Sequence, residues 1–141
     1  MIERELDLTV YEKAIKSLEE IVKIYETNRE ENMCDIFRDS LIQRFEYTFE
    51  LSHKILRRYI AWHIPMPDNE VAELSFSEII RIANEKGLLQ QPKYRWELFR
   101  KMRNLTSHTY DEKLADDVIS VIPQFLEEVQ RLLFKMKENL Q

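Results

Sequence analysis

The fold is decided by residues 34–62, which read CDIFRDSLIQRFEYTFELSHKILRRYIAW and contain neither glycine nor proline. Apolar and small residues recur in this stretch at spacings of three and four, which is typical of a helix buried along one face. The inner stripe comprises Ile36, Leu41, Phe45, Thr48, Ser52, Ile55 and Tyr59, and it is widened by Phe37, Phe49, Leu51 and Leu56. The stretch predicts one long helix that Pro65 and Pro67 end. Its wide apolar face indicates either an ordinary bundle core or helix packing in a homodimer.

Three capping boxes predict where further helices begin. In a capping box, a Ser or Thr and a Glu three residues later satisfy the first free N–H groups of a helix. The pattern occurs at Thr9-x-x-Glu12, Ser75-x-x-Glu78 and Thr109-x-x-Glu112. It predicts a first helix that runs to about Asn28, a short helix that ends at a left-handed Gly87, and a long C-terminal helix kinked at Pro123.

The remaining segments complete an all-α chain. Pro92 precedes a helix with large apolar residues along one side, which we expect to end between Asn104 and Ser107. We expect residues 63–74 to form a loop, and no stretch shows the alternating pattern of a β-strand. We therefore predict a single domain over residues 1–141 with an up-down bundle of about five helices.

Composition excludes several classes of protein. Gly87 is the only glycine and Cys34 the only cysteine among 141 residues. These counts exclude glycine-rich phosphate loops, dinucleotide fingerprints, internal disulfides and multi-cysteine zinc sites. The histidines His53, His63 and His108 lack metal-ligand spacing, and we expect neither a metal nor a cofactor. No apolar run reaches the about 18 residues of a membrane span, so we expect a cytoplasmic protein that does not bind membranes.

Positive charge is concentrated locally, although the net charge is −5. The cations Lys93, Arg95, Arg100, Lys101 and Arg103 surround a single acid, Glu97, and a second group consists of Lys54, Arg57 and Arg58. The net charge argues against a general nucleic-acid coat protein. Two interpretations of the groups are open: solvated helix faces, or a local phosphate-binding surface on an acidic body.

The segment RNLTSHTY, residues 103–110, places an arginine, an amide, an imidazole and a phenol close together. On an unbroken helix, Arg103 and His108 would point about 140° apart, so only the predicted break between helices lets them converge. A helix N-terminus and neighbouring arginines disfavour an imidazolium. We therefore expect a neutral His108 that can act as a general base. Arg103 can grip a phosphate through paired hydrogen bonds, and Asn104 can orient either group.

These groups suffice for RNA cleavage without a metal. His108 would remove the proton of a ribose 2′-hydroxyl, which attacks the adjacent phosphorus, and Arg103 would stabilise the developing charge. The structural alternative is that Arg103 complements the end of one helix and His108 caps the next. Both interpretations fit the residues taken alone.

Glu46 and Glu50 lie four residues apart on the predicted long helix. Like charges at this spacing cost about 0.2–0.5 kcal/mol. We expect one of the two to pair across the bundle with Arg100 or Arg103.

Two motifs resemble a known family. Residues 40–54, SLIQRFEYTFELSHK, resemble the second-helix signature of the nucleotidyltransferase substrate-binding proteins. Arg103-Asn104-x-x-x-His108-x-Tyr110 resembles the Arg-x4-His-x-Tyr motif of the HEPN superfamily. Length and motif order agree with the family over essentially the whole chain. One departure is His53, where relatives often carry tryptophan, and it leaves the motif chemistry untouched.

The resemblance implies a HEPN-like bundle that forms a homodimer, with the two motifs facing each other across the dimer cleft. It also implies a separate minimal nucleotidyltransferase as partner. Many such proteins are metal-independent ribonuclease toxins, with Arg103 and His108 in the catalytic positions and Asn104 beside them. The nucleotidyltransferase is then the antitoxin, which in some pairs transfers AMP to the motif tyrosine, here Tyr110. The resemblance leaves open a non-catalytic subunit that binds substrate or nucleotide for a two-component nucleotidyltransferase.

Overall fold

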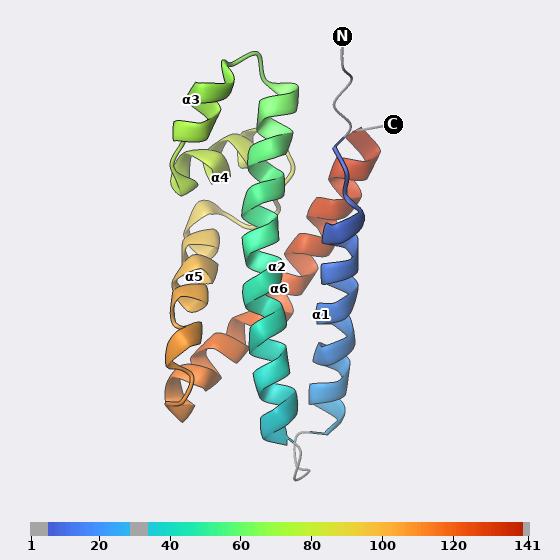
Figure 1. Ribbon diagram of the computed structural model, residues 1–141, viewed down its shortest axis with the longest axis vertical. Coiled ribbons are helices and arrows are strands. Elements are labelled where there is room, and N and C mark those ends of the chain that lie inside the picture. The colour runs from blue at the N-terminus through green and yellow to red at the C-terminus, as the bar shows by residue number, and fades with distance from the viewer. Residues whose placement is uncertain (1–5, 29–33, 140–141) are drawn as a thin grey trace.

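The computed structural model describes residues 6–28 and 34–139 (Figure 1). Over these ranges the chain is helical and contains no strand, which confirms the predicted all-α bundle. In chain order, the elements are α1 (Thr9–Thr27), α2 (Cys34–His63), α3 (Asp68–Glu73), α4 (Phe76–Glu85), α5 (Lys93–Asn104), the 3-10 turn η1 (Thr106–His108) and α6 (Glu112–Asn139). Within the described ranges, none of these helices combines the length and apolarity that crossing a bilayer requires.

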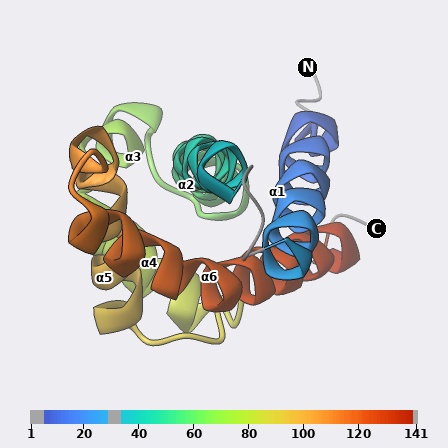
Figure 2. The same cartoon turned by 90° about the horizontal axis from the view of Figure 1, so that it is seen from below.

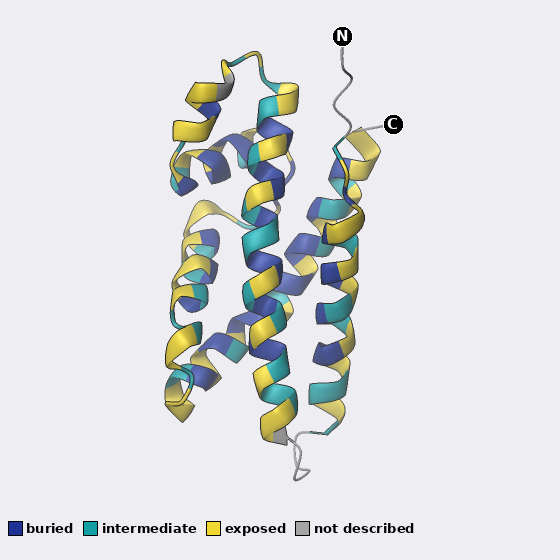
Figure 3. Ribbon diagram, in the orientation of Figure 1, coloured by how far each residue is buried: buried dark blue, intermediate teal, exposed yellow. Residues whose placement is uncertain are grey.

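The helix α2 is the central element and contacts each of the other helices. α1 lies along one side of α2, whereas α3, α4 and α5 follow one another along the other side (Figures 1 and 2). α6 crosses behind α2 and contacts both α1 and α5. It continues through Pro123, and the kink expected there stays a prediction. The other described helices therefore leave one face of α2 uncovered, the face turned toward the viewer in Figure 3.

Most residues of the predicted inner stripe of α2 are buried in the core of the bundle. Aromatic rings from α2, α5 and α6 meet at its centre, where Phe125 lies edge-on to Phe45 at 5.0 Å and to Phe99 at 5.4 Å between ring centres. The two polar members of the stripe are also buried. Ser52 Oγ, for example, lies 2.7 Å from the hydroxyl of Tyr11 on α1 and donates to the carbonyl of Thr48. Thr48 Oγ1 likewise donates to the carbonyl of Arg44, so both polar members of the stripe have partners, as burial demands.

The prediction that Ile36 belongs to the buried stripe is wrong, because this residue is 60% exposed. It lies eleven residues before Tyr47, which is close to three helical turns, and Tyr47 is 54% exposed. The two apolar side chains therefore share the uncovered face of α2.

The predicted ends of α4 are confirmed. Ser75 Oγ accepts the N–H of Glu78 at 3.1 Å, and the same hydroxyl lies 3.0 Å from the Glu78 carboxylate. At the other end, Gly87 adopts a positive φ of 75°. The N–H of Leu88 donates to the carbonyl of Ala83 at 3.0 Å, which is the long hydrogen bond of a Schellman cap.

The other two predicted capping boxes are wrong. Thr9 lies inside α1, and its N–H donates to Asp7 Oδ1 at 2.9 Å. The hydroxyl of Thr109 donates back to the carbonyl of Thr106. Asp111 Oδ1 instead accepts the N–H of Lys113 at 2.9 Å, so α6 begins at Glu112. In both cases a nearby aspartate, an equally good acceptor, replaces the threonine.

The predicted loop 63–74 contains the short helix α3, which is a further correction. Arg57 of α2 donates to the carbonyls of Val71 at 2.6 Å and Leu74 at 3.0 Å. These bonds satisfy carbonyl groups at the end of α3, and the Val71 side chain is buried in the core. A helix of this length depends on tertiary contacts, which a local sequence pattern does not reveal.

A buried carboxylate fixes the connection from α4 to α5. Glu128 of α6 is 2% exposed. It accepts the N–H groups of Gln90 at 3.0 Å and Gln91 at 2.7 Å, and the indole N–H of Trp96 at 3.0 Å. Three donors thus compensate the burial of this carboxylate, and they hold the start of α5 against α6.

Candidate functional site

The predicted break between Arg103 and His108 is confirmed. α5 ends at Asn104, η1 ends at His108, and α6 begins only at Glu112. The N–H of His108 donates to the carbonyl of Leu105 at 2.9 Å, and the N–H of Asp111 donates to the carbonyl of His108 at 3.2 Å. One tight turn therefore lies between the motif arginine and the motif histidine, and a second turn follows the histidine and leads into α6.

Arg103 is held by an acid of α2. Its Nε atom lies 2.6 Å from Glu50 Oε1, and the two side chains are 33% and 43% exposed. This ion pair confirms the expected pairing of a glutamate of the long helix with Arg103. Neither terminal Nη atom of Arg103 forms a hydrogen bond with the described residues, so the outer edge of the guanidinium is available to a ligand.

Glu46 holds the turn that follows. The hydroxyl of Thr106 in η1 hydrogen-bonds to Glu46 Oε2, and it lies 2.7 Å from the carbonyl oxygen of Arg103. Glu46 and Glu50 are one helical turn apart on α2. They therefore fix the two halves of the motif, one through η1 and the other through α5, and these contacts offset their mutual repulsion.

Asn104, His108 and Tyr110 are all exposed, and the side chain of Tyr110 is 86% exposed. The His108 and Tyr110 rings lie 6.2 Å apart in an edge-on arrangement. Within the described chain, no hydrogen bond or ion pair joins Arg103 to His108. The break thus leaves the imidazole open to solvent without bringing it into contact with the guanidinium.

The expected position of His108 directly before a helix is wrong. Asp111 caps α6, and His108 lies four residues before its first residue. The influence of a helix dipole falls off within about one turn, so the dipole of α6 gives little support to the expectation of a neutral imidazole. The neutral state of His108 stays a prediction.

A polar groove of about 610 Å³ lies beside Tyr110, and sequence reasoning missed it. Its lining residues are Arg38, Asp39, Ile42, Gln43, Glu46, Thr106, Thr109, Tyr110 and Glu112. Arg38, Ile42 and Glu46 recur every four residues on α2, which is the signal that could have placed them on one face. The groove contains three acids and one arginine, so its charge is negative.

On the opposite side of Arg103, the basic groups meet along the contact between α2 and α5. The Cζ atom of Arg100 lies 4.9 Å from the centre of the Phe76 ring, and the His53 ring lies 5.4 Å from the same ring. Arg57 Nη2 donates to His53 Nε2 at 3.2 Å. Burial lowers the pKa of the His53 imidazole, and the Arg57 charge lowers it further. The α2–α5 seam, which we define as Glu50, His53, Arg57, Arg100 and Arg103, is thus positive.

Residues 6–28 and 34–139 offer no group of three His, Cys, Asp or Glu side chains arranged to hold a metal ion.

Comparisons with known proteins agree in one family. Residues 6–138 match a family model that is described as "nucleotidyltransferase substrate binding protein like". A Haemophilus influenzae protein named probable ribonuclease HepT is 34% identical over 146 residues, which cover 100% of this chain and 99% of that protein.

Two solved structures are similar to the whole bundle. One, from Haemophilus influenzae, is described as revealing the fold of a substrate binding domain of a nucleotidyltransferase. It has a TM-score of 0.82 and 32% identity, covering 93% of this chain and 99% of that chain. The other, from Thermus thermophilus, has a TM-score of 0.68 and 31% identity, covering 89% of this chain and 97% of that chain.

Proposed function

This chain belongs to the family of nucleotidyltransferase substrate binding proteins, and from that premise we propose that it is a HEPN-type ribonuclease that needs no metal. One observation carries the proposal. The break between α5 and α6 exposes His108, while Glu50 pairs with the Nε atom of Arg103 and leaves the Nη atoms without hydrogen-bond partners among residues 6–28 and 34–139. The name of the 34% identical relative, probable ribonuclease HepT, supports the same activity.

The proposed reaction uses groups of this chain and the RNA itself. His108 takes the proton of a ribose 2′-hydroxyl, and the 2′-oxygen attacks the adjacent phosphorus. The bond from phosphorus to the 5′-oxygen breaks, which leaves a 2′,3′-cyclic phosphate, and the departing oxygen takes a proton from water. The Nη atoms of Arg103 stabilise the added negative charge on the phosphate, and Asn104, next to Arg103, orients the reacting groups.

We propose further that a separate minimal nucleotidyltransferase controls the enzyme as its antitoxin. Its target is Tyr110, whose 86% exposure makes the hydroxyl accessible. The phenol oxygen attacks the α-phosphorus of ATP and loses its proton, and pyrophosphate leaves. The AMP group then adds bulk and negative charge next to the His108 ring, 6.2 Å away, which repels an RNA phosphate.

The active form that we propose is a homodimer, with the two motifs facing each other across a cleft. Two observations support this assembly: one face of α2 is left uncovered by the other described helices (Figure 3), and Ile36 and Tyr47 of α2 expose apolar surface. A second copy would cover that surface and bring a second His108 and Arg103 to the RNA.

A non-catalytic role is the second candidate. Within one chain, Arg103 and His108 share no hydrogen bond, and one solved relative is described as a substrate binding domain of a nucleotidyltransferase. In this role, the same cations hold a nucleotide or a substrate for the partner enzyme.

Cleavage of RNA by the purified chain in the presence of EDTA separates the two functions. The ribonuclease proposal expects cleavage that persists under chelation and yields fragments with 2′,3′-cyclic phosphate ends, as identified by mass spectrometry. Absence of cleavage, together with a changed activity of a co-purified nucleotidyltransferase, would instead establish the binding role.

A further inference from the structure

Arg100 lies next to the motif arginine on the exposed side of α5. It precedes Arg103 by three residues, so the two Cβ atoms are neighbours about 5–6 Å apart on one helix face. The guanidinium of Arg100 is packed over the Phe76 ring at 4.9 Å, a cation–π contact that holds the charge without neutralising it. Arg100 is therefore a positioned cation rather than a freely moving surface chain.

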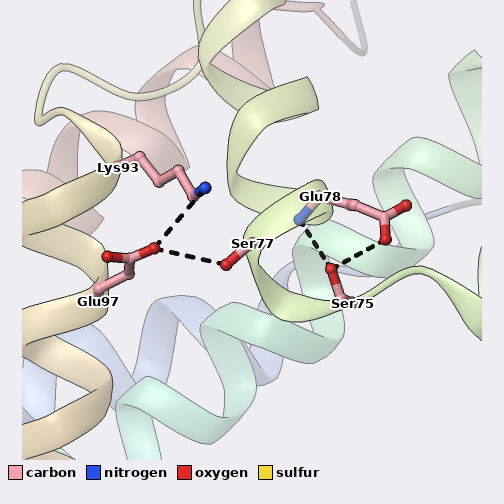
Figure 4. A network of polar contacts seen from close by, with 5 residues as sticks. All are labelled: Ser75, Ser77, Glu78, Lys93 and Glu97. Atoms are coloured by element: carbon pink, nitrogen blue, oxygen red, sulfur yellow. Dashed lines mark hydrogen bonds and ion pairs between the residues drawn. The ribbon is translucent and has the colours of Figure 1, made fainter.

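No acid of the described chain neutralises Arg100. The only acid of α5, Glu97, lies three residues earlier, but its carboxylate is 3.8 Å from Lys93 Nζ and 3.5 Å from Ser77 Oγ (Figure 4). Glu50 of α2, which belongs to the same α2–α5 seam, is already paired with Arg103. The charge around Arg100 is therefore positive and has no internal counterion.

From this arrangement we infer that Arg100 is a second phosphate-binding residue, which takes the phosphate adjacent to the one bound by Arg103 on the same RNA strand. The inference rests on the proposed function in one respect, the binding of the reacting phosphate by Arg103. Its consequence is a substrate class: the site binds a polynucleotide with consecutive phosphates in preference to a mononucleotide.

Charge also gives the strand a direction. On one side of Arg103, the groove beside Tyr110 carries Asp39, Glu46 and Glu112, which repel phosphate. On the other side, the α2–α5 seam continues to Arg100 and Arg57. A single strand bound at Arg103 therefore extends along the α2–α5 seam, in the manner of the basic tracks that hold single-stranded nucleic acids.

The test measures binding rather than cleavage. A fluorescent 2′-O-methyl oligoribonucleotide cannot be cleaved by 2′-oxygen attack, and its affinity is followed by anisotropy over a series of KCl concentrations. We expect Arg100→Gln to weaken binding several-fold. We also expect it to reduce the slope of log affinity against log salt by about 0.7, the value for one contact to a single strand. Arg100→Lys keeps the charge and should keep the slope, and binding of AMP should be the same in all variants.

Arg81→Gln is the matched control, because it removes the same charge from α4, where Arg81 pairs with Glu85 at 3.0 Å. Equal effects of Arg81→Gln and Arg100→Gln, an unchanged slope in Arg100→Gln, or no binding by the wild-type chain would each overturn the inference. Cleavage of unmodified RNA is scored separately. If binding depends on Arg100 but RNA is not cleaved, Arg100 is a phosphate-binding residue and the proposed ribonuclease activity is wrong. If RNA is cleaved but binding does not depend on Arg100, the ribonuclease proposal stands and the inference about Arg100 is wrong.

Discussion

Glu50 shows how one side chain can prepare another for a ligand. An arginine fork can bind two acceptors at once. Here the Nε atom lies 2.6 Å from Glu50 Oε1, and the terminal nitrogens form no hydrogen bond within the described part of the chain. The ion pair thus favours one orientation of the guanidinium, in which the terminal nitrogens are available to the proposed RNA substrate. Because both side chains are partly exposed, the ion pair contributes little to folding, about 0.2–1 kcal/mol. We assign Glu50 a positioning role rather than a stabilising one.

Replacing Glu50 with glutamine keeps the shape of the side chain and removes its charge. We expect Glu50→Gln to lower kcat for RNA cleavage with a smaller change in KM, because Arg103 loses its fixed orientation in the transition state. Glu85→Gln, which breaks the exposed pair with Arg81 on α4, is the control and should cleave normally. Steady-state kinetics measure kcat and KM of both variants, and an unchanged kcat in Glu50→Gln would show that Glu50 does not position Arg103.

At the scale of the elements, α5 owes its position to contacts at both ends. Its last turn is held by Glu50 of α2, and the connection before its first turn is held by the buried carboxylate of Glu128 on α6. The two anchors come from different helices, so α5 and the motif at its end are fixed relative to the bundle rather than to one neighbour.

Removing the buried anchor should loosen this arrangement. Glu128→Ala leaves the N–H groups of Gln90, Gln91 and Trp96 without their acceptor, and we expect a loss of about 3 kcal/mol or more in the free energy of unfolding. The neighbouring Glu127→Ala changes an exposed side chain and should stay within about 0.5 kcal/mol of the wild type. Urea denaturation compares them, and equal stabilities would show that Glu128 is no anchor.

Sequence patterns predicted the long elements well, because apolar periodicity records burial directly. They also predicted the break after Asn104, and they predicted that Glu46 or Glu50 pairs with Arg100 or Arg103, of which the structure forms the Glu50–Arg103 pair. The errors are local: at Thr9 and Thr109 a nearby aspartate supplied the acceptor, and α3 depends on carbonyl contacts from Arg57. The groove beside Tyr110 could not be predicted, because it requires the rotation of α2 relative to η1.

At the scale of the whole molecule, the central position of α2 determines what the chain presents to a second copy. The other described helices leave one face of α2 uncovered (Figures 2 and 3), and the exposed apolar residues of α2 include Ile36 and Tyr47.

A charge on that face should therefore prevent assembly. Tyr47→Glu alters a side chain that is 54% exposed in the single chain, so we expect normal stability but a shift from dimer to monomer in sedimentation velocity, with reduced RNA cleavage. Phe134→Glu is the control, since Phe134 is exposed on α6, which covers the other side of α2. A Tyr47→Glu protein that sediments as a dimer would place the interface elsewhere.

The most direct test of metal-free RNA cleavage at the break between α5 and α6 is the cleavage rate of His108→Ala in the presence of EDTA, measured beside His63→Ala. Loss of a general base should lower the rate by about 10²–10⁴-fold, whereas His63, exposed at the end of α2, should be dispensable. We predict that His63→Ala cleaves RNA at the wild-type rate and that folded His108→Ala forms no measurable 2′,3′-cyclic phosphate. Cleavage by folded His108→Ala at the wild-type rate would contradict the account.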